Sequence, residues 1–94
     1  MTMDVTFDPD KSARNQLERG LSFEMAADFD FETATFVRDE RRDYGEERMV
    51  AIGYFERRLH VLCFLDLPAG IRVISFRKAN EREGRKYGKP QTLD

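Results

Sequence analysis

The sequence predicts a single α+β domain with two N-terminal helices, an antiparallel sheet of four to five strands and a C-terminal helix. Its 94 residues are the length of one small domain, covering 1–94. Apolar residues recur at helical spacing in the first third of the chain. Residues 33–77 instead hold β-branched and aromatic runs separated by short polar turns, which is typical of antiparallel hairpins.

The N-terminal third predicts a short strand and then two helices. Val5 and Phe7 suit a short first strand. The segment 8–19 predicts a helix, because it opens with an N-capping aspartate and a proline and is followed by Gly20. A second helix is expected from Ser22, and the two would form a helical hairpin.

The rest of the chain predicts strands followed by one helix. Strands are expected at 33–37, 49–55, 59–67 and 71–77. Asn80 suits the N-cap of a helix to Tyr87, which Gly84 weakens by roughly 1 kcal/mol. Cys63 lies in an apolar run and is predicted to be a buried thiol. The tail 88–94 is expected to be loose.

Composition and charge indicate where in the cell the protein acts and what kind of partner it binds. One cysteine excludes an internal disulfide. With no secretion signal and no apolar run near the roughly 20 residues of a membrane span, we expect a cytoplasmic protein. Residues 72–89 hold seven basic and two acidic side chains, whereas residues 1–71 hold nine basic and fifteen acidic ones. This asymmetry favours a polyanionic partner despite the net charge of −2.

Several kinds of catalytic site are excluded by their missing motifs. The sequence has no glycine-rich phosphate loop, no CxxC motif and no helix with paired histidines. One histidine and one cysteine cannot build a zinc site. The acidic pairs at 39–40 and 46–47 are more simply a solvated loop than metal ligands. A basic site without a metal or other cofactor is the remaining prediction.

The basic residues near the C-terminus suit phosphate binding. Arg72 and Ile74 are expected to share one face of the last strand, with Arg77 at its end. Guanidinium groups can hold two phosphate oxygens at once. Tyr87 suits stacking on a base, and His60 is the only side chain with an ordinary pKa near neutrality. The candidate RNA-binding residues are Lys78, Arg82, Arg85 and Lys86, of which Arg82 and Lys86 share a helix face.

Three segments give the sequence a family resemblance. They are "FDPDKSARN" followed by "RGLSFEMA", then "GEERMVAIG" at 45–53, and finally "IRVISFRKANEREGRKY". Their order and spacing resemble the BrnT-type toxins of bacterial toxin–antitoxin systems, small ribonucleases with a RelE-like fold. The resemblance spans residues 7–87.

The resemblance implies metal-independent RNA cleavage that inhibits translation, with attack by the ribose 2′-hydroxyl on the neighbouring phosphate. It makes Arg72 and Arg77 phosphate ligands, and it matches Lys11 and Asn15 of the first helix, and Glu83 and Tyr87 of the last, to family residues. The candidate catalytic set is therefore Arg72, Arg77, His60, Lys11 and Tyr87.

The chain departs from the family pattern at three places. Glu18-Arg19-Gly20 stands where family members usually read Lys-His-Gly, Phe76 stands for Ala, and Asp66-Leu67 stands for Glu-Arg. A catalytically silent relative that binds an antitoxin and takes part in operon repression is therefore an alternative, and a plain RNA-binding domain is a third. The implied partner is a ribbon-helix-helix antitoxin of the BrnA-like type, with operator DNA bound only through that antitoxin.

Overall fold

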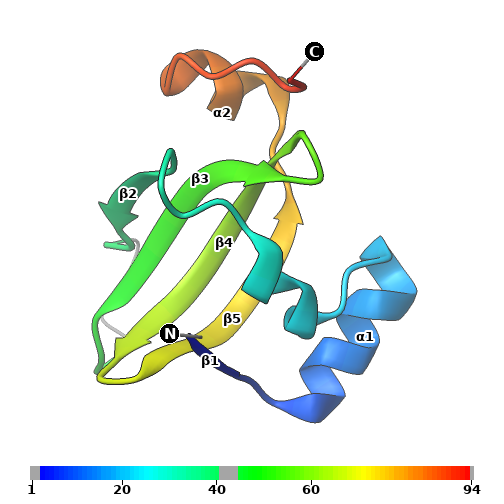
Figure 1. Ribbon diagram of the computed structural model, residues 1–94, viewed down its shortest axis with the longest axis vertical. Coiled ribbons are helices and arrows are strands. Elements are labelled where there is room, and N and C mark those ends of the chain that lie inside the picture. The colour runs from blue at the N-terminus through cyan, green and yellow to red at the C-terminus, as the bar shows by residue number, and fades with distance from the viewer. Residues whose placement is uncertain (1–2, 41–44, 94) are drawn as a thin grey trace.

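The computed structural model describes residues 3–40 and 45–93 and confirms the α+β class. One five-stranded sheet has the order β1-β5-β4-β3-β2. Neighbouring strands are antiparallel except that β1 runs parallel to β5. Helix η1 lies against one face of the sheet, α1 lies next to η1 beside the edge of β5, and α2 lies beyond one end of the sheet (Figure 1). The elements are β1 Asp4–Thr6, α1 Pro9–Arg19, η1 Phe23–Asp28, β2 Thr35–Arg38, β3 Arg48–Phe55, β4 Arg58–Leu67, β5 Gly70–Lys78 and α2 Glu81–Lys86.

The first helix has the predicted ends, but the second is a 3₁₀ helix. The Asp8 carboxylate accepts from the Asp10 amide at 2.9 Å, and Gly20 ends α1 with φ 72°. In η1 the buried residues Phe23 and Ala26 stand three apart, which matches three residues per turn. Ser22 occupies the N-cap position of η1 without a capping side-chain bond. None of the described helices has both the length and the apolar content to cross a membrane.

The main core lies between the sheet and the segment 21–29, which contains η1, and α1 contributes no residue to it. Phe76 is at its centre, with no exposed surface and edge-on contacts to the rings of Phe29 and Phe55. A smaller cluster on the opposite face includes Ile52 and Val61 and has Tyr87 packed against it. Burying both faces explains why β4 is apolar on both sides.

A bulge in β5 changes which side chains share a face. Cys63 pairs with Ser75 but the next residue, Phe64, pairs with Val73, so Ile74 is an extra residue in β5. Strict alternation would put Arg72 and Arg77 on opposite faces, since they stand five apart. The bulge brings both to the face opposite α1 and η1.

The C-terminal tail is held in place, whereas the sequence predicts a loose one. The Tyr54 hydroxyl donates to the Pro90 carbonyl at 2.7 Å, and the Leu59 amide donates to the Gln91 carbonyl at 2.8 Å. Gly84 permits this contact, since a Cβ there would lie 2.8 Å from the Lys89 carbonyl oxygen. The tail satisfies backbone groups at the start of β4, which sequence patterns do not reveal.

Candidate active site

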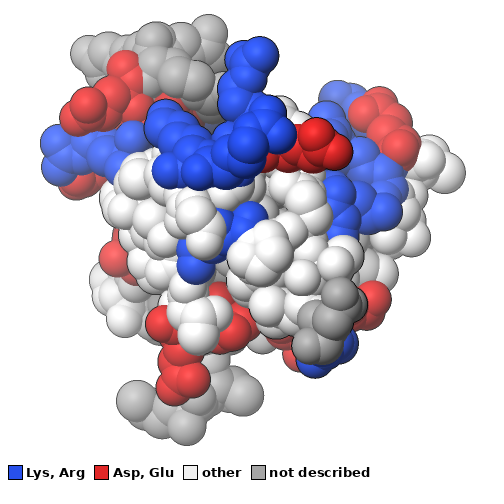
Figure 2. All heavy atoms as spheres, turned by 90° about the horizontal axis from the view of Figure 1, so that it is seen from above, with Lys and Arg blue, Asp and Glu red and all other residues white. Residues whose placement is uncertain are grey.

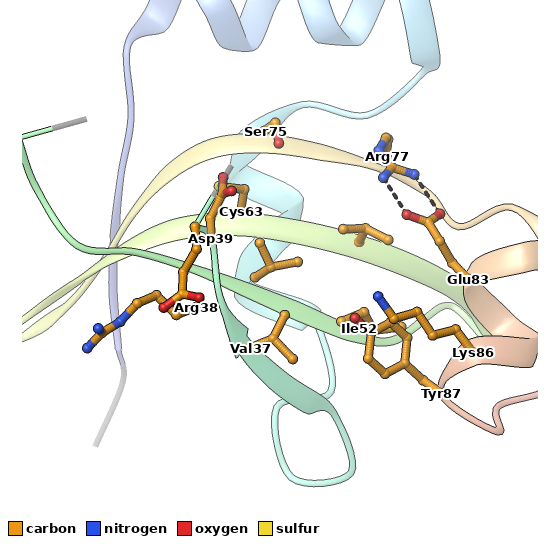
Figure 3. Close-up of a pocket in the computed structure, with 13 residues that line it drawn as sticks. Val37, Arg38, Asp39, Ile52, Cys63, Ser75, Arg77, Glu83, Lys86 and Tyr87 are labelled. Atoms are coloured by element: carbon orange, nitrogen blue, oxygen red, sulfur yellow. Dashed lines mark hydrogen bonds and ion pairs between the residues drawn. The ribbon is translucent and has the colours of Figure 1, made fainter. Parts of the chain in front are cut away.

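A pocket of about 310 Å³ opens on the sheet face opposite α1 and η1, between β2, β5 and α2. Its apolar lining comes from adjacent strands and includes Val50, Ile52 and Val61. Arg77, Lys86 and Tyr87 stand at the α2 side, and Asp39 and Cys63 stand at the other (Figure 3). The predicted strand arginine and two predicted residues of the last helix therefore line one cavity.

Glu83 fixes Arg77 in this pocket. The two guanidinium nitrogens donate to the two Glu83 carboxylate oxygens at 2.9 and 2.6 Å. Glu83 also accepts from the Asn80 amide at 2.9 Å and completes a capping box at the start of α2. The hydrogen bond from Arg77 holds the pKa of Glu83 below its usual value, so the carboxylate stays ionised. The pair therefore joins the end of β5 to α2 and orients the guanidinium.

Lys86 supplies the available positive charge of the pocket. Its ammonium lies 5.3 Å from the ring centre of Tyr87, and within the described part of the chain it has no carboxylate partner. Arg38 also lines the pocket, but it pairs with Glu47 and its guanidinium points away from the cavity in Figure 3. An anion entering the pocket would meet Lys86 without first breaking an ion pair.

Asp39 is part of the pocket, although the sequence predicts a solvated loop there. It is 8% exposed, its amide donates to the Arg48 carbonyl at 2.8 Å, and its carboxylate lies 4.0 Å from the Cys63 sulfur. Cys63 is buried, as predicted. Of the other acidic residues, Glu46 and Glu47 pair with Arg48 and Arg38. Over residues 3–40 and 45–93, no group of three or more His, Cys, Asp or Glu side chains is placed to hold a metal ion.

His60 lies apart from the pocket, in the core on the other side of the sheet. It is 2% exposed, and its ring stands 5.4 Å from the ring centres of both Phe55 and Phe76. Nδ1 donates to the Arg58 carbonyl at 2.7 Å, since a carbonyl oxygen can only accept. Burial lowers the pKa of His60, which keeps the ring neutral. We therefore leave His60 out of the site.

The sequence was compared with models of known protein families. The family model described as "Ribonuclease toxin, BrnT, of type II toxin-antitoxin system" matches residues 7–83. The chain belongs to the BrnT family. The resemblance carried by the three sequence segments is thereby confirmed. Comparison with curated proteins found no match.

BrnT-family membership indicates a ribonuclease toxin with an RNA target and an antitoxin partner. The matched region runs from just before α1 into α2 and includes Arg72, Arg77 and Glu83. It ends before Lys86 and Tyr87, so the assignment of these two residues to the site depends on the pocket geometry.

The other predicted residues of this BrnT-family chain do not line the pocket. Arg72 is exposed on the same face, opposite Leu65, and Lys11 lies on α1. Lys78, Arg82 and Arg85 are exposed, and Arg85 stands 3.6 Å from Glu81. Seen from the α2 end, basic side chains form a strip with acidic ones beside it (Figure 2).

Two pocket residues were not predicted from the sequence: Ser75 was not among the candidates, and Asp39 was expected in a solvated loop. Ser75 lines the pocket on the same face as Arg77, which stands two residues further along β5, so period-two alternation from Arg77 was the available signal. Asp39 follows the edge strand β2 directly, and that position was the available signal. Neither could be chosen from residue type alone.

Proposed function

We propose that this BrnT-family protein is a metal-independent endoribonuclease toxin that acts in the cytoplasm, where its cleavage of RNA inhibits translation. The observation that supports this most is the meeting of Lys86, Arg77 and Tyr87 in one pocket of a chain that belongs to a ribonuclease toxin family. Two cations and an aromatic ring suit a phosphodiester with its neighbouring base.

In the proposed reaction the ribose 2′-hydroxyl loses its proton to solvent as its oxygen attacks the adjacent phosphorus, the bond from phosphorus to the 5′-oxygen of the next nucleotide breaks, and that oxygen takes up a proton from solvent. A 2′,3′-cyclic phosphate and a 5′-hydroxyl result. Negative charge builds on the non-bridging oxygens in the transition state, and Lys86 and Arg77 offset it. Glu83 acts as a positioning residue, because it fixes the Arg77 fork through two hydrogen bonds. Tyr87 holds a flanking base by stacking.

The proposed antitoxin partner is a small ribbon-helix-helix protein of the BrnA-like type. It would contact operator DNA, and the toxin would reach that DNA only through it. An acidic or apolar antitoxin segment covering the pocket would block access to Lys86 and neutralise the toxin.

Two observations favour a second function, that of a catalytically silent relative that binds its antitoxin. Arg77 is already held by both oxygens of Glu83, and His60 is buried outside the pocket. A silent relative would leave growth and RNA unaffected when its expression is induced.

The experiment that separates these functions is RNA cleavage by the purified chain in EDTA. We expect wild type to cut RNA and to leave cyclic phosphate ends. Arg77→Ala should slow the reaction by about 10²-fold, because it removes one transition-state contact. Arg72→Ala should lower the cleavage rate roughly tenfold, because Arg72 lies outside the pocket and would contact a neighbouring phosphate. Cleavage that requires added Mg²⁺ would contradict the metal-independent reaction, and intact RNA would favour the silent relative.

A further inference from the structure

A second groove, of about 230 Å³, meets the pocket at Ser75. Its walls are α1 on one side and Ile74 and Ser75 of β5 on the other. Ser75 is exposed and lines both the groove and the pocket, so the two hollows adjoin at the edge of the sheet. In Figure 3 the Ser75 side chain lies at the pocket edge formed by β5.

The helix wall of this groove is a single face of α1. Its members are Lys11, Arg14, Asn15, Glu18 and Arg19, which recur at three- and four-residue spacing. Asn15 fixes this face against the sheet, because its amide nitrogen donates to the Phe76 carbonyl at 2.9 Å and to the Leu21 carbonyl at 2.8 Å. The ladder between β1 and β5 ends at Arg72, and α1 borders the bulged part of β5 beyond it.

The charges of this groove suit a polyanion. Lys11, Arg14 and Arg19 are exposed, and Glu18 is the one acidic residue among the groove's lining residues. Arg72 and Arg77 flank Ser75 on the adjoining sheet face. Basic side chains thus continue from the pocket, around the edge of β5, and along α1. A track of this kind is what a single-stranded nucleic acid backbone requires.

We propose that an RNA strand whose scissile phosphate occupies the pocket continues over Ser75 into the α1 groove, where Lys11, Arg14 and Arg19 bind its flanking phosphates. This inference rests on the proposed ribonuclease function. Lys11 is then a residue that binds RNA away from the reacting phosphate. Affinity for long substrates depends on the groove, whereas the chemical step does not.

The test compares Arg14→Gln/Arg19→Gln with wild type on two RNA probes. The first is an uncleavable 2′-O-methyl oligonucleotide of about twelve nucleotides, within the range that single-strand grooves occupy. The second is the shortest oligonucleotide that wild type cleaves. Arg57→Asn is the control for the loss of an exposed positive charge, because it removes one such charge outside both hollows. Asparagine also tolerates the positive φ of 65° at that position.

We expect the double variant to bind the long probe roughly tenfold more weakly, with the salt dependence of log K reduced by about 1.4 for two lost contacts. Its kcat/KM on the shortest substrate and the behaviour of Arg57→Asn should match wild type. Unchanged binding of the long probe would overturn the proposal that RNA occupies the α1 groove, and it would leave the proposed ribonuclease function standing. An equal loss on the shortest substrate would also overturn it, by placing Arg14 and Arg19 at the scissile phosphate.

Two further outcomes separate this inference from the proposed function. If the double variant binds RNA normally but escapes its antitoxin, the groove belongs to the antitoxin and the RNA track is overturned. If wild type neither binds nor cleaves RNA, the proposed function fails and the track fails with it.

Discussion

Lys86→Ala should slow RNA cleavage by about 10²- to 10³-fold, the cost of removing one group that stabilises charge in a transition state. Lys86 is the pocket cation without a carboxylate partner in the described residues, so its whole charge is available to the phosphate. Because the side chain is exposed, we expect the free energy of unfolding to change by no more than about 0.5 kcal/mol. The measurement is single-turnover cleavage in EDTA.

Two controls keep this result interpretable. Arg57→Asn removes one exposed charge from the β3–β4 turn and should cleave as wild type does. Lys86→Arg keeps the charge and should recover part of the rate. Wild-type cleavage by Lys86→Ala would remove Lys86 from the mechanism.

Phe76→Ala should lower the free energy of unfolding by about 3–5 kcal/mol, as large cavities in protein cores do. Phe76 is fully buried and contacts the rings of Phe29, Phe55 and His60. The total free energy of unfolding of a native protein is only about 5–15 kcal/mol, so the variant should be close to unfolding at physiological temperature. Urea denaturation followed by circular dichroism measures the change.

The matched control is Phe36→Ala, at a ring that is 45% exposed on the edge strand β2. It should cost about 1 kcal/mol or less, because much of its surface already faces water. An equal decrease in the free energy of unfolding for Phe76→Ala and Phe36→Ala would show that the core is not centred on Phe76. A loss at Phe76 also threatens the site, since its carbonyl anchors Asn15 and its neighbour is Arg77.

Local chemistry made much of the fold predictable. The capping aspartate and glycine define both ends of α1, because they satisfy backbone groups that the helix leaves free. Alternation in β4 correctly separates Val61 and Cys63 from His60 and Leu62. The Asn80 cap of α2 was equally readable, since its partner Glu83 stands three residues on.

Long-range features were not predictable in this way. The β5 bulge depends on pairing with β4, and the docking of the tail depends on backbone groups of β4 far away in sequence. The sequence also does not say which face of the sheet α1 and η1 cover. That choice buries the His60 ring in the core and leaves the Arg77 side chain at the pocket.

The charge asymmetry of the sequence pointed to one end of the sheet, and the role of each basic residue there stays a prediction. Concentrated basic residues predicted a site at the end of the last strand and in the helix after it, and the pocket lies there. Sequence patterns did not reveal that Glu83 holds Arg77 with both oxygens while Lys86 has no such partner. Pairing of charges depends on side-chain geometry, which residue type and spacing leave open.

The most direct test of the account is to map where RNA binds, by NMR of amide shifts on titration with the uncleavable 2′-O-methyl oligonucleotide. We predict that the largest amide shifts fall at four residues around the pocket: Ser75, Arg77, Lys86 and Tyr87. Shifts confined to other surfaces, with these four amides unmoved at saturation, would contradict it.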